Sequence, residues 1–267
     1  MSQRVDVSQI QKYYILISKS QIKLITSLQQ NKNRNKTGLF VAEGPKIIKD
    51  LLKAGLQLHS LFSSTSFNAS GDIRSDELSG FSDNMILVSQ IKLQKISALK
   101  TANTMLAVFH IPKKKEISQN GLQLALDGVR DPGNLGTIIR LCDWFGVTHL
   151  ICSQDTVDCY NSKVVQATMG SIARVTISYV DLEAHFQHTD LPIYVAVMDG
   201  ESIYEETLPE EAILVMGNEA NGISPNLTSL IQKKITIPNF RKKDTAESLN
   251  VATAVGILLS EFRRNGS

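Results

Sequence analysis

Cysteine, tryptophan and long apolar runs are all scarce in this chain of 267 residues. Its three cysteines form no CxxC pair, so their spacing favours neither a disulfide framework nor a zinc site. No run of about 18 apolar residues occurs, and the N-terminal MSQRVDVSQIQKYY lacks the apolar segment of a secretory signal. We therefore expect a soluble, cytoplasmic protein with reduced thiols, no membrane association and no bound metal.

The charge of the chain is distributed unevenly. The net charge is +2, but residues 1–120 carry +9 and residues 121–267 carry −7. Apolar residues make up 42% and charged residues 20%, which excludes a disordered or fibrous chain, and the length predicts one or two domains. A strongly basic half favours a polyanion such as nucleic acid as partner, although a small domain can also carry such charge for solubility.

Residues 1–112 are predicted to form a small α/β domain. Apolar spacing predicts a helix over 15–30, a strand over 39–44, a helix over 45–55 that Pro45 begins and Gly55 ends, and further strands within 56–62, 85–89 and 105–111. A helix is expected at 90–99, and the serine-rich segment 63–84 is expected to be a surface loop. The segment 31–38 is rich in turn-forming residues. It carries basic side chains that are candidate RNA contacts or simply solvated charges: Lys32, Arg34 and Lys36.

Residues 113–120, with their run of lysines, are predicted to be a basic linker to a second domain over 121–267. In that second part, apolar strand patterns alternate with helical patterns, which predicts a mostly parallel sheet covered on both faces. Ligands of such sheets bind at the carboxyl ends of the strands. The loops that follow the predicted strands are therefore the places to look for chemistry.

Two of these loops combine turn-forming residues with polar side chains. In DGVRDPGNLGTIIR, Asn134 is placed to cap a helix, and Arg140 lies away from the buried stripe of that helix. In MGNEANG, Gly217 and Gly222 flank Glu219 directly after a strand, so the backbone can approach a ligand closely. Asn134 could also be an ordinary helix cap, Arg140 a solvated arginine, and the segment around Glu219 a plain turn.

The third stretch is IPNFRKKDTAESLNVATAVGILLSEF. Its helix is apolar on nearly every side, so either its own domain or another subunit must cover it. Ser248 and Asn250 lie at the polar start of this helix, where Ser248 could be a cap and nothing more. The five histidines show no metal-ligand spacing, and no GxSxG or HExxH motif supports a hydrolase.

Taken together and in order, the three stretches resemble the SpoU/TrmH branch of the SPOUT RNA methyltransferases. DPGNLGTIIR (131–140), GNEANG (217–222) and IPNF…ESLNV (237–251) match the three motifs of that branch. The likeness covers 121–267. In the first domain, FVAEGPKIIKDLL is similar to the small α/β substrate-binding domain that often precedes this catalytic domain.

The resemblance implies a trefoil knot near the C-terminus, S-adenosylmethionine as cofactor, and a homodimer whose active site uses both subunits. The implied reaction is methylation of a ribose 2′-hydroxyl in structured RNA, ribosomal RNA ahead of transfer RNA. Carried onto this chain, the family's cofactor contacts fall at Met216, Gly217, Ile237 and Leu249. Its active-site positions fall at Asn134, Arg140, Glu219, Ser248 and Asn250.

The guanidinium of Arg140 offers five donors and a fixed positive charge, so we expect it to position phosphate and to stabilise the oxyanion that forms on the sugar. The loop between Pro238 and Ser248 lacks the glycine often found there and carries a basic triplet, of which Arg241 is a candidate RNA contact. The alternatives are an inactive RNA-binding or ribosome-assembly factor of the same fold, a tRNA ribose methyltransferase, and a plain nucleotide-binding enzyme that would lack the usual phosphate loop.

Overall fold

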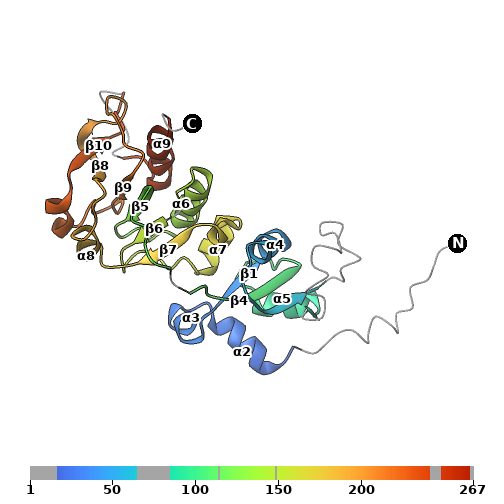
Figure 1. Cartoon of the computed structure of the whole chain (residues 1–267). Coiled ribbons are helices and arrows are strands. Elements are labelled where there is room, and N and C mark those ends of the chain that lie inside the picture. The colour runs from blue at the N-terminus through green and yellow to red at the C-terminus, as the bar shows by residue number, and fades with distance from the viewer. Residues whose placement is uncertain (1–16, 65–84, 114, 148, 241–247, 265–267) are drawn as a thin grey trace, which may run out of the picture. The chain divides into compact units, whose positions relative to one another are not determined.

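The computed structural model describes residues 17–64, 85–113, 115–147, 149–240 and 248–264. The chain forms two compact units (Figure 1). One comprises the residues up to Pro112 together with Tyr160–Gln166, and the other comprises Lys113–Cys159 and the residues from Ala167 onward. Each unit combines helices with a sheet, as predicted. The surface loop expected at 63–84 lies almost wholly outside the described residues.

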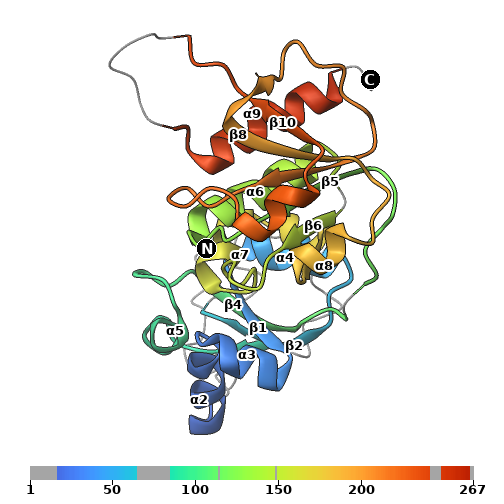
Figure 2. The same cartoon turned by 90° about the vertical axis from the view of Figure 1, so that its left-hand side faces the viewer.

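The first unit is built on a four-stranded sheet of order β1-β4-β2-β3. Figure 2 labels β1, β2 and β4 of this sheet. β4 pairs antiparallel with both β1 and β2, and β3 pairs parallel with β2. The elements in chain order are α2 (Lys19–Ser27), α3 (Asn31–Thr37), β1 (Leu39–Glu43), α4 (Pro45–Lys53), β2 (Leu58–Ser63), β3 (Met85–Leu87), α5 (Gln90–Ile96) and β4 (Met105–His110). The strands and helices predicted from apolar spacing are therefore present, with shorter bounds at most ends.

The turn-rich segment 31–38 was wrongly predicted, because it forms the helix α3. Arg34 explains the difference. Its side chain is only 2% exposed, and its guanidinium donates to the carbonyl of Leu28 at 2.7 Å. Gly38 ends the helix with a left-handed backbone (φ +66°), a conformation that glycine adopts without steric cost. A buried arginine and a glycine stop therefore stabilise a helix that weak local propensity does not indicate.

The remaining elements alternate between strands and helical segments except at one point, where two strands follow each other directly. In chain order they are β5 (Leu122–Leu126), α6 (Pro132–Trp144), β6 (His149–Cys152), α7 (Ser162–Thr168), η3 (Ser171–Ala173), β7 (Thr176–Tyr179), α8 (Leu182–Phe186), β8 (Ile193–Ser202), β9 (Ala212–Met216), η4 (Pro225–Leu230), β10 (Lys233–Thr236) and α9 (Val251–Arg263). This alternation confirms the strand–helix rhythm that the sequence predicts for the second part of the chain.

The second unit contains a six-stranded sheet of order β10-β8-β9-β5-β6-β7, in which every neighbouring pair is parallel. α8 and η4 pack on one face around Ile193, Ile213 and Val215. α6 and α9 lie side by side, apart from α8 (Figure 1). Because β5 and β9 are neighbours in a parallel sheet, the loops that follow them emerge at the same edge. This topology brings together the first two motif loops, which are about 85 residues apart in the chain.

Helix α9 is partly covered by its own unit. Val255, Leu258 and Leu259 are buried, whereas Ile257 on another side is only half-buried. No helix among the described residues has the length and apolar character needed to cross a membrane. The trefoil knot stays a prediction, because residues 241–247, which join β10 to α9, lie outside the described residues.

Candidate active site

A cavity of about 410 Å³ opens at the carboxyl end of the parallel sheet in the second unit. Met216, Gly217, Ile237 and Leu249, the four positions predicted to contact cofactor, all line it. They come from the end of β9, the residues after β10 and the segment before α9, which are far apart in the chain. The cavity falls within the ~300–1,000 Å³ of small-molecule sites, and its walls are largely apolar side chains.

One wall of the cavity arises from an irregularity in strand pairing. β10 pairs with β8 at Val195 and then, one residue later on β10, at Glu201. The residues of β8 that this shift leaves out of the ladder include Ala196, Val197 and Met198, all of which line the cavity. The shift therefore makes room beside the sheet, and no motif in the sequence signals it.

Three of the predicted active-site residues are joined by hydrogen bonds. The Asn134 amide donates to the Glu219 carboxylate at 2.6 Å, and the Asn250 amide donates to the Asn134 carbonyl oxygen at 2.9 Å. The Asn134 side chain is thus fixed at both its donor and its acceptor. This short chain of bonds connects the three motif loops, which are contributed by the ends of β5, β9 and the segment before α9.

The same residues sit at helix starts, but not in the way the sequence predicts. Asp131, and not Asn134, is the N-cap of α6, since its carboxylate accepts from the backbone N–H of Asn134 at 2.8 Å. Asn250 is the N-cap of α9 and accepts from the N–H groups of Ala252 and Thr253. With Asp131 capping the helix, the Asn134 side chain is available for Glu219. Ser248 precedes the cap and lines the cavity beside Glu219.

Arg140 is placed differently from the other predicted catalytic residues. It is exposed on the face of α6 that points away from the buried stripe, as predicted, and it is not among the described residues that line the cavity. Within one chain, the structure therefore assembles four of the five predicted active-site residues and leaves Arg140 outside.

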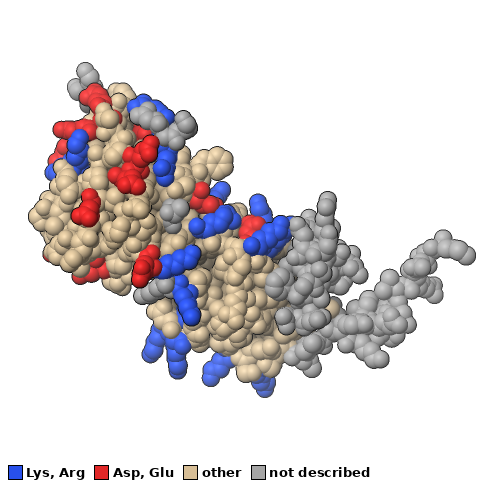
Figure 3. Space-filling view, in the orientation of Figure 1, with Lys and Arg blue, Asp and Glu red and all other residues tan. Residues whose placement is uncertain are grey.

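The residues predicted to contact RNA also differ in where the structure places them. Lys32 and Lys36 are exposed on α3. Arg34 is buried and bonded within the first unit, so it is withdrawn from the set of phosphate contacts. Arg241 lies outside the described residues. Figure 3 shows Lys and Arg side chains spread over the first unit and Asp and Glu side chains concentrated on the second, in agreement with the charges of the two parts.

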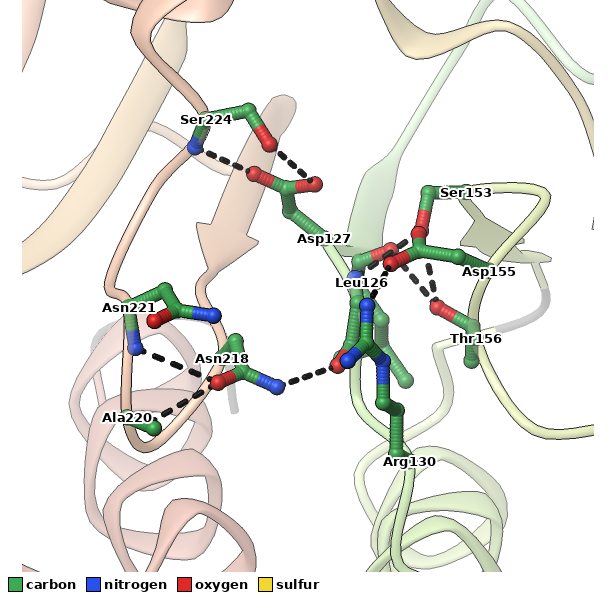
Figure 4. Close-up of polar contacts among 11 residues, drawn as sticks. Leu126, Asp127, Arg130, Ser153, Asp155, Thr156, Asn218, Ala220, Asn221 and Ser224 are labelled. Atoms are coloured by element: carbon green, nitrogen blue, oxygen red, sulfur yellow. Dashed lines mark hydrogen bonds and ion pairs between the residues drawn. The ribbon is translucent and has the colours of Figure 1, made fainter.

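Two residues that the sequence did not single out hold the motif loops together. Asp127 accepts from both the backbone and the hydroxyl of Ser224, and Asn218 donates to the carbonyl of Gly128 at 2.6 Å (Figure 4). Asp127 directly follows a buried strand, and Asn218 stands between Gly217 and Glu219. The one signal in the sequence that could have identified them was their position, Asp127 just before the first motif and Asn218 within the second.

Hydrogen bonds favour the ionised form of Asp155, which lies beside the loop after β5. The Ser153 hydroxyl and then the Arg130 guanidinium hydrogen-bond to Asp155, and both lower the pKa of that carboxyl. Burial raises the pKa of Cys142 and of Cys152. In the part of the chain that the structure describes, no group of three His, Cys, Asp or Glu side chains is arranged to hold a metal ion. The side chains that the site brings together are two amides, a carboxylate and a hydroxyl beside an apolar cavity.

A parallel sheet with a cavity at its strand ends and a polar chain from three loops is an α/β architecture suited to binding a small molecule. Comparison with known proteins specifies the family. The model of the SpoU rRNA Methylase family matches residues 121–260, and that of the MRM3-like substrate binding domain matches residues 19–107. The chain belongs to the SpoU rRNA methylase family.

Relatives and solved structures agree with this assignment. The Bacillus subtilis 23S rRNA (guanosine(2553)-2′-O)-methyltransferase RlmP is 29% identical, with 88% of this chain and 93% of the relative covered. A TrmH-family protein from Porphyromonas gingivalis is 37% identical with a TM-score of 0.81, covering 94% of this chain and 99% of that one. An AdoMet-bound rRNA methyltransferase from Sinorhizobium meliloti is 27% identical with a TM-score of 0.79, covering 93% and 97%. The chain is an S-adenosylmethionine-dependent RNA methyltransferase.

Proposed function

We propose that this enzyme transfers the methyl group of S-adenosylmethionine to a ribose 2′-hydroxyl of ribosomal RNA. The observation that carries the proposal is the chain of hydrogen bonds from Asn250 through Asn134 to Glu219, which joins the three motif loops at the edge of the apolar cavity. The full-length relative RlmP is named for this reaction on 23S rRNA, and the first unit matches a substrate-binding domain. A tRNA substrate is the second candidate, since an Aquifex aeolicus relative is named as a tRNA methyltransferase.

The cavity residues fit the cofactor. Ile237, Leu249 and Met216 give apolar walls suited to an adenine ring, and Gly217 leaves the backbone open to a ligand. When bound, the cofactor supplies an electrophilic methyl group on a positively charged sulfur. Glu219 and Ser248 would contribute a carboxylate and a hydroxyl to the wall of the same cavity.

The polar chain positions the second reactant. Asn134 is held by Glu219 and Asn250, so its amide keeps one orientation and can present a fixed contact to the ribose. Alignment of two reactants can supply ~7–11 kcal/mol of rate enhancement in favourable cases. We assign Asn134, Glu219, Ser248 and Asn250 to this alignment, and we assign the stabilisation of the oxyanion that forms on the sugar to the Arg140 guanidinium.

Arg140 serves the active site of a second subunit in this proposal. A groove between α6 and α9 is lined by Thr137, Leu141 and Ile257, with Phe145 at its end. Arg140 lies three residues after Thr137, on the exposed side of α6 next to this groove. A second copy of the chain seated on the groove would cover the half-buried side of α9 and receive the guanidinium of Arg140. The proposal therefore includes a homodimer with shared active sites.

The basic surface of the first unit binds the RNA backbone. Lys32 and Lys36 are exposed there, and we propose that they contact phosphate. Arg241, in the loop before α9, is proposed to contact RNA near the methylated nucleotide. Residues 113–120 are retained as the basic linker between a substrate-binding domain (1–112) and a catalytic domain (121–267).

The experiment that tests the reaction is labelled methyl transfer to purified RNA. Wild-type enzyme, radiolabelled S-adenosylmethionine and unmodified ribosomal or transfer RNA are combined, and the product is digested with alkali. A 2′-O-methyl group blocks cleavage at its own nucleotide, so the label is expected in an alkali-resistant dinucleotide from ribosomal RNA. Label in transfer RNA alone would favour the second candidate. Calorimetry that detects no S-adenosylmethionine binding would instead support an inactive RNA-binding factor.

Mixing two impaired variants tests the shared active site. Arg140→Ala and Glu219→Gln are each expected to be strongly impaired but measurable in single turnover, whereas mixed dimers recover one working site that combines Glu219 of one chain with Arg140 of the other. No recovery after subunit exchange would contradict the shared site. Near-normal methyl transfer by Arg140→Ala alone, with Arg140→Lys as its conservative partner, would remove Arg140 from catalysis.

A further inference from the structure

The loop that carries Glu219 is a closed turn held by one side chain. Asn218 and Gly222 exchange two backbone hydrogen bonds, at 2.9 and 2.8 Å. The Asn218 side-chain oxygen accepts from the N–H groups of Ala220 and Asn221, at 2.9 and 3.2 Å (Figure 4). A Cβ atom at Gly217 would lie 2.5 Å from the backbone of Gly222, so the turn closes this tightly only because residue 217 is glycine.

The closed turn is tied to the loop after β5 at two points. The other end of the Asn218 amide donates to the carbonyl oxygen of Gly128 at 2.6 Å. Asp127, which is 6% exposed, accepts from the backbone N–H of Ser224 at 2.6 Å and from its hydroxyl at 3.0 Å. Figure 4 shows these contacts bridging the two strand ends. The two ties lie on either side of Glu219 in the sequence.

The anchor on the β5 side is itself fixed. The backbone N–H of Gly128 donates to the Ser153 hydroxyl at 2.8 Å, and the Thr156 hydroxyl donates to the carbonyl of Leu126 at 3.2 Å. Gly128 has a left-handed backbone (φ +74°) with Asp155 close by, so a larger residue there would be strained. The carbonyl that receives Asn218 therefore has a position set by β6 and not by solvent.

We propose that Asn218 and Asp127 are positioning residues for methyl transfer, which they serve by setting the distance between Glu219 and Asn134. Asn134 lies in the first turn of α6, directly after the loop that contains Asp127 and Gly128, so the two ties fix both ends of the Asn134–Glu219 hydrogen bond. Asp127 lies outside the three motif stretches, and Asn218 lies within GNEANG at a position for which the resemblance gives no role. This proposal rests on the proposed function, since it concerns how the same site is held.

Asn218→Asp separates the two tasks of the side chain. An aspartate can still accept from Ala220 and Asn221, but it cannot donate to Gly128 and places a carboxylate against that carbonyl. We expect single-turnover methyl transfer to fall about 100-fold, the order of loss that misplacement of reactants by about 1 Å produces. Because Asn218 also lines the cofactor cavity, the rates are compared at saturating S-adenosylmethionine. Asn221→Asp is the matched control. It makes the same charge change in the same turn at an exposed side chain, and the rate should stay within about threefold of wild type.

A second pair of variants guards against simple unfolding. Asp127→Asn can keep both contacts to Ser224, accepting from the N–H and donating to the hydroxyl, so its rate should remain near wild type. Asp127→Ala loses both contacts and should lose rate as Asn218→Asp does. The double variant Asn218→Asp/Glu219→Gln should be no slower than Glu219→Gln alone, because a residue that acts through Glu219 has no effect once that carboxylate is gone.

Hydrogen exchange tests whether Asp127 holds the turn in place independently of methyl transfer. Amide exchange of Ala220 and Asn221 should rise in Asp127→Ala, whether or not RNA is methylated. Unchanged exchange, or equal rate losses in Asn218→Asp and Asn221→Asp, would overturn the positioning role, as would additive losses in the double variant. A wild-type enzyme that transfers no methyl group to RNA would instead contradict the proposed function.

Discussion

At the scale of single residues, the site depends on an asparagine whose donor and acceptor are both used. Asn134 donates to Glu219 and accepts from Asn250, and Asp131 relieves it of capping α6. Sequence motifs identified all three polar residues but gave them separate tasks. The structure shows that they act as one hydrogen-bonded group, so substitutions within it are expected to be non-additive.

Asn134→Asp tests this group with almost no change of shape. The aspartate can accept from Asn250, but it cannot donate to Glu219 and places two carboxylates together. We expect methyl transfer to fall about 100-fold while the fold persists. Single-turnover rates and far-ultraviolet circular dichroism are the measurements. Asn226→Asp is the control, since Asn226 makes an equivalent bond to Glu183 between η4 and α8. An equal loss in the control would contradict the role of Asn134.

At the scale of secondary-structure elements, the start of α9 joins stability to catalysis. Asn250 caps two backbone N–H groups and also reaches Asn134. Asn250→Ala should cost about 1 kcal/mol of unfolding free energy through the lost cap. Asn250→Asp keeps a good cap but cannot donate to Asn134, so it should retain stability and lose methyl transfer. Chemical denaturation and single-turnover rates measured on both variants check this. Equal activity in Asn250→Asp and wild type would show that the bond to Asn134 has no catalytic role.

The strand β6 contributes a pH dependence to stability. Burial, and then the neighbouring His185, lower the pKa of His149 below its ordinary value of 6.5. Its ring lies against the Ser178 hydroxyl at 3.0 Å. A histidine that is kept neutral in the folded state takes up its proton more readily when unfolded. Stability is therefore full above about pH 6.5 and falls as the pH drops below that value.

Denaturation at pH 7.5 and pH 5.0 measures this effect. Wild type should be less stable at pH 5.0, and His149→Gln should reduce the difference, with His188→Gln, at an exposed position, as control. A similar pH dependence in wild type and His149→Gln would contradict the assignment. A second loss is expected at lower pH, because hydrogen bonds from Arg174 lower the pKa of Asp143 and its protonation removes that stabilisation.

The elements also show where sequence-based inference succeeds and where it fails. Apolar periodicity located the strands of both sheets and the helix α6. Burial on one or both faces leaves a direct pattern in the sequence, as it does in β5, β9 and α6. It missed α3, whose stability comes from a buried arginine, and the pairing shift of β8 that opens the cavity. It also missed Asn218 and Asp127, because their importance lies in contacts between loops that are distant in the chain.

At the scale of the whole molecule, the uneven charge indicates that the first part of the chain binds RNA and the second part carries the cavity. Residues 1–120 carry +9, and residues 121–267, which contain the cavity, carry −7. RNA affinity should therefore fall steeply with salt, as phosphate contacts release counterions. Lys36→Ala should weaken binding and reduce the slope of log affinity against log salt by about 0.7. Lys234→Ala, at an exposed lysine of the second unit, should leave the slope unchanged. Binding that is insensitive to salt would contradict an electrostatic role for the first unit.

The central claim is that three loops of one chain form a site for methylation of a ribose 2′-hydroxyl in ribosomal RNA. The most direct test maps 2′-O-methyl groups across total RNA from cells with the gene, without it, and with the Asn134→Asp variant in its place. We predict one ribosomal nucleotide that is methylated only when the wild-type enzyme is present. A ribosomal RNA methylation map that is identical in all three strains would contradict the claim.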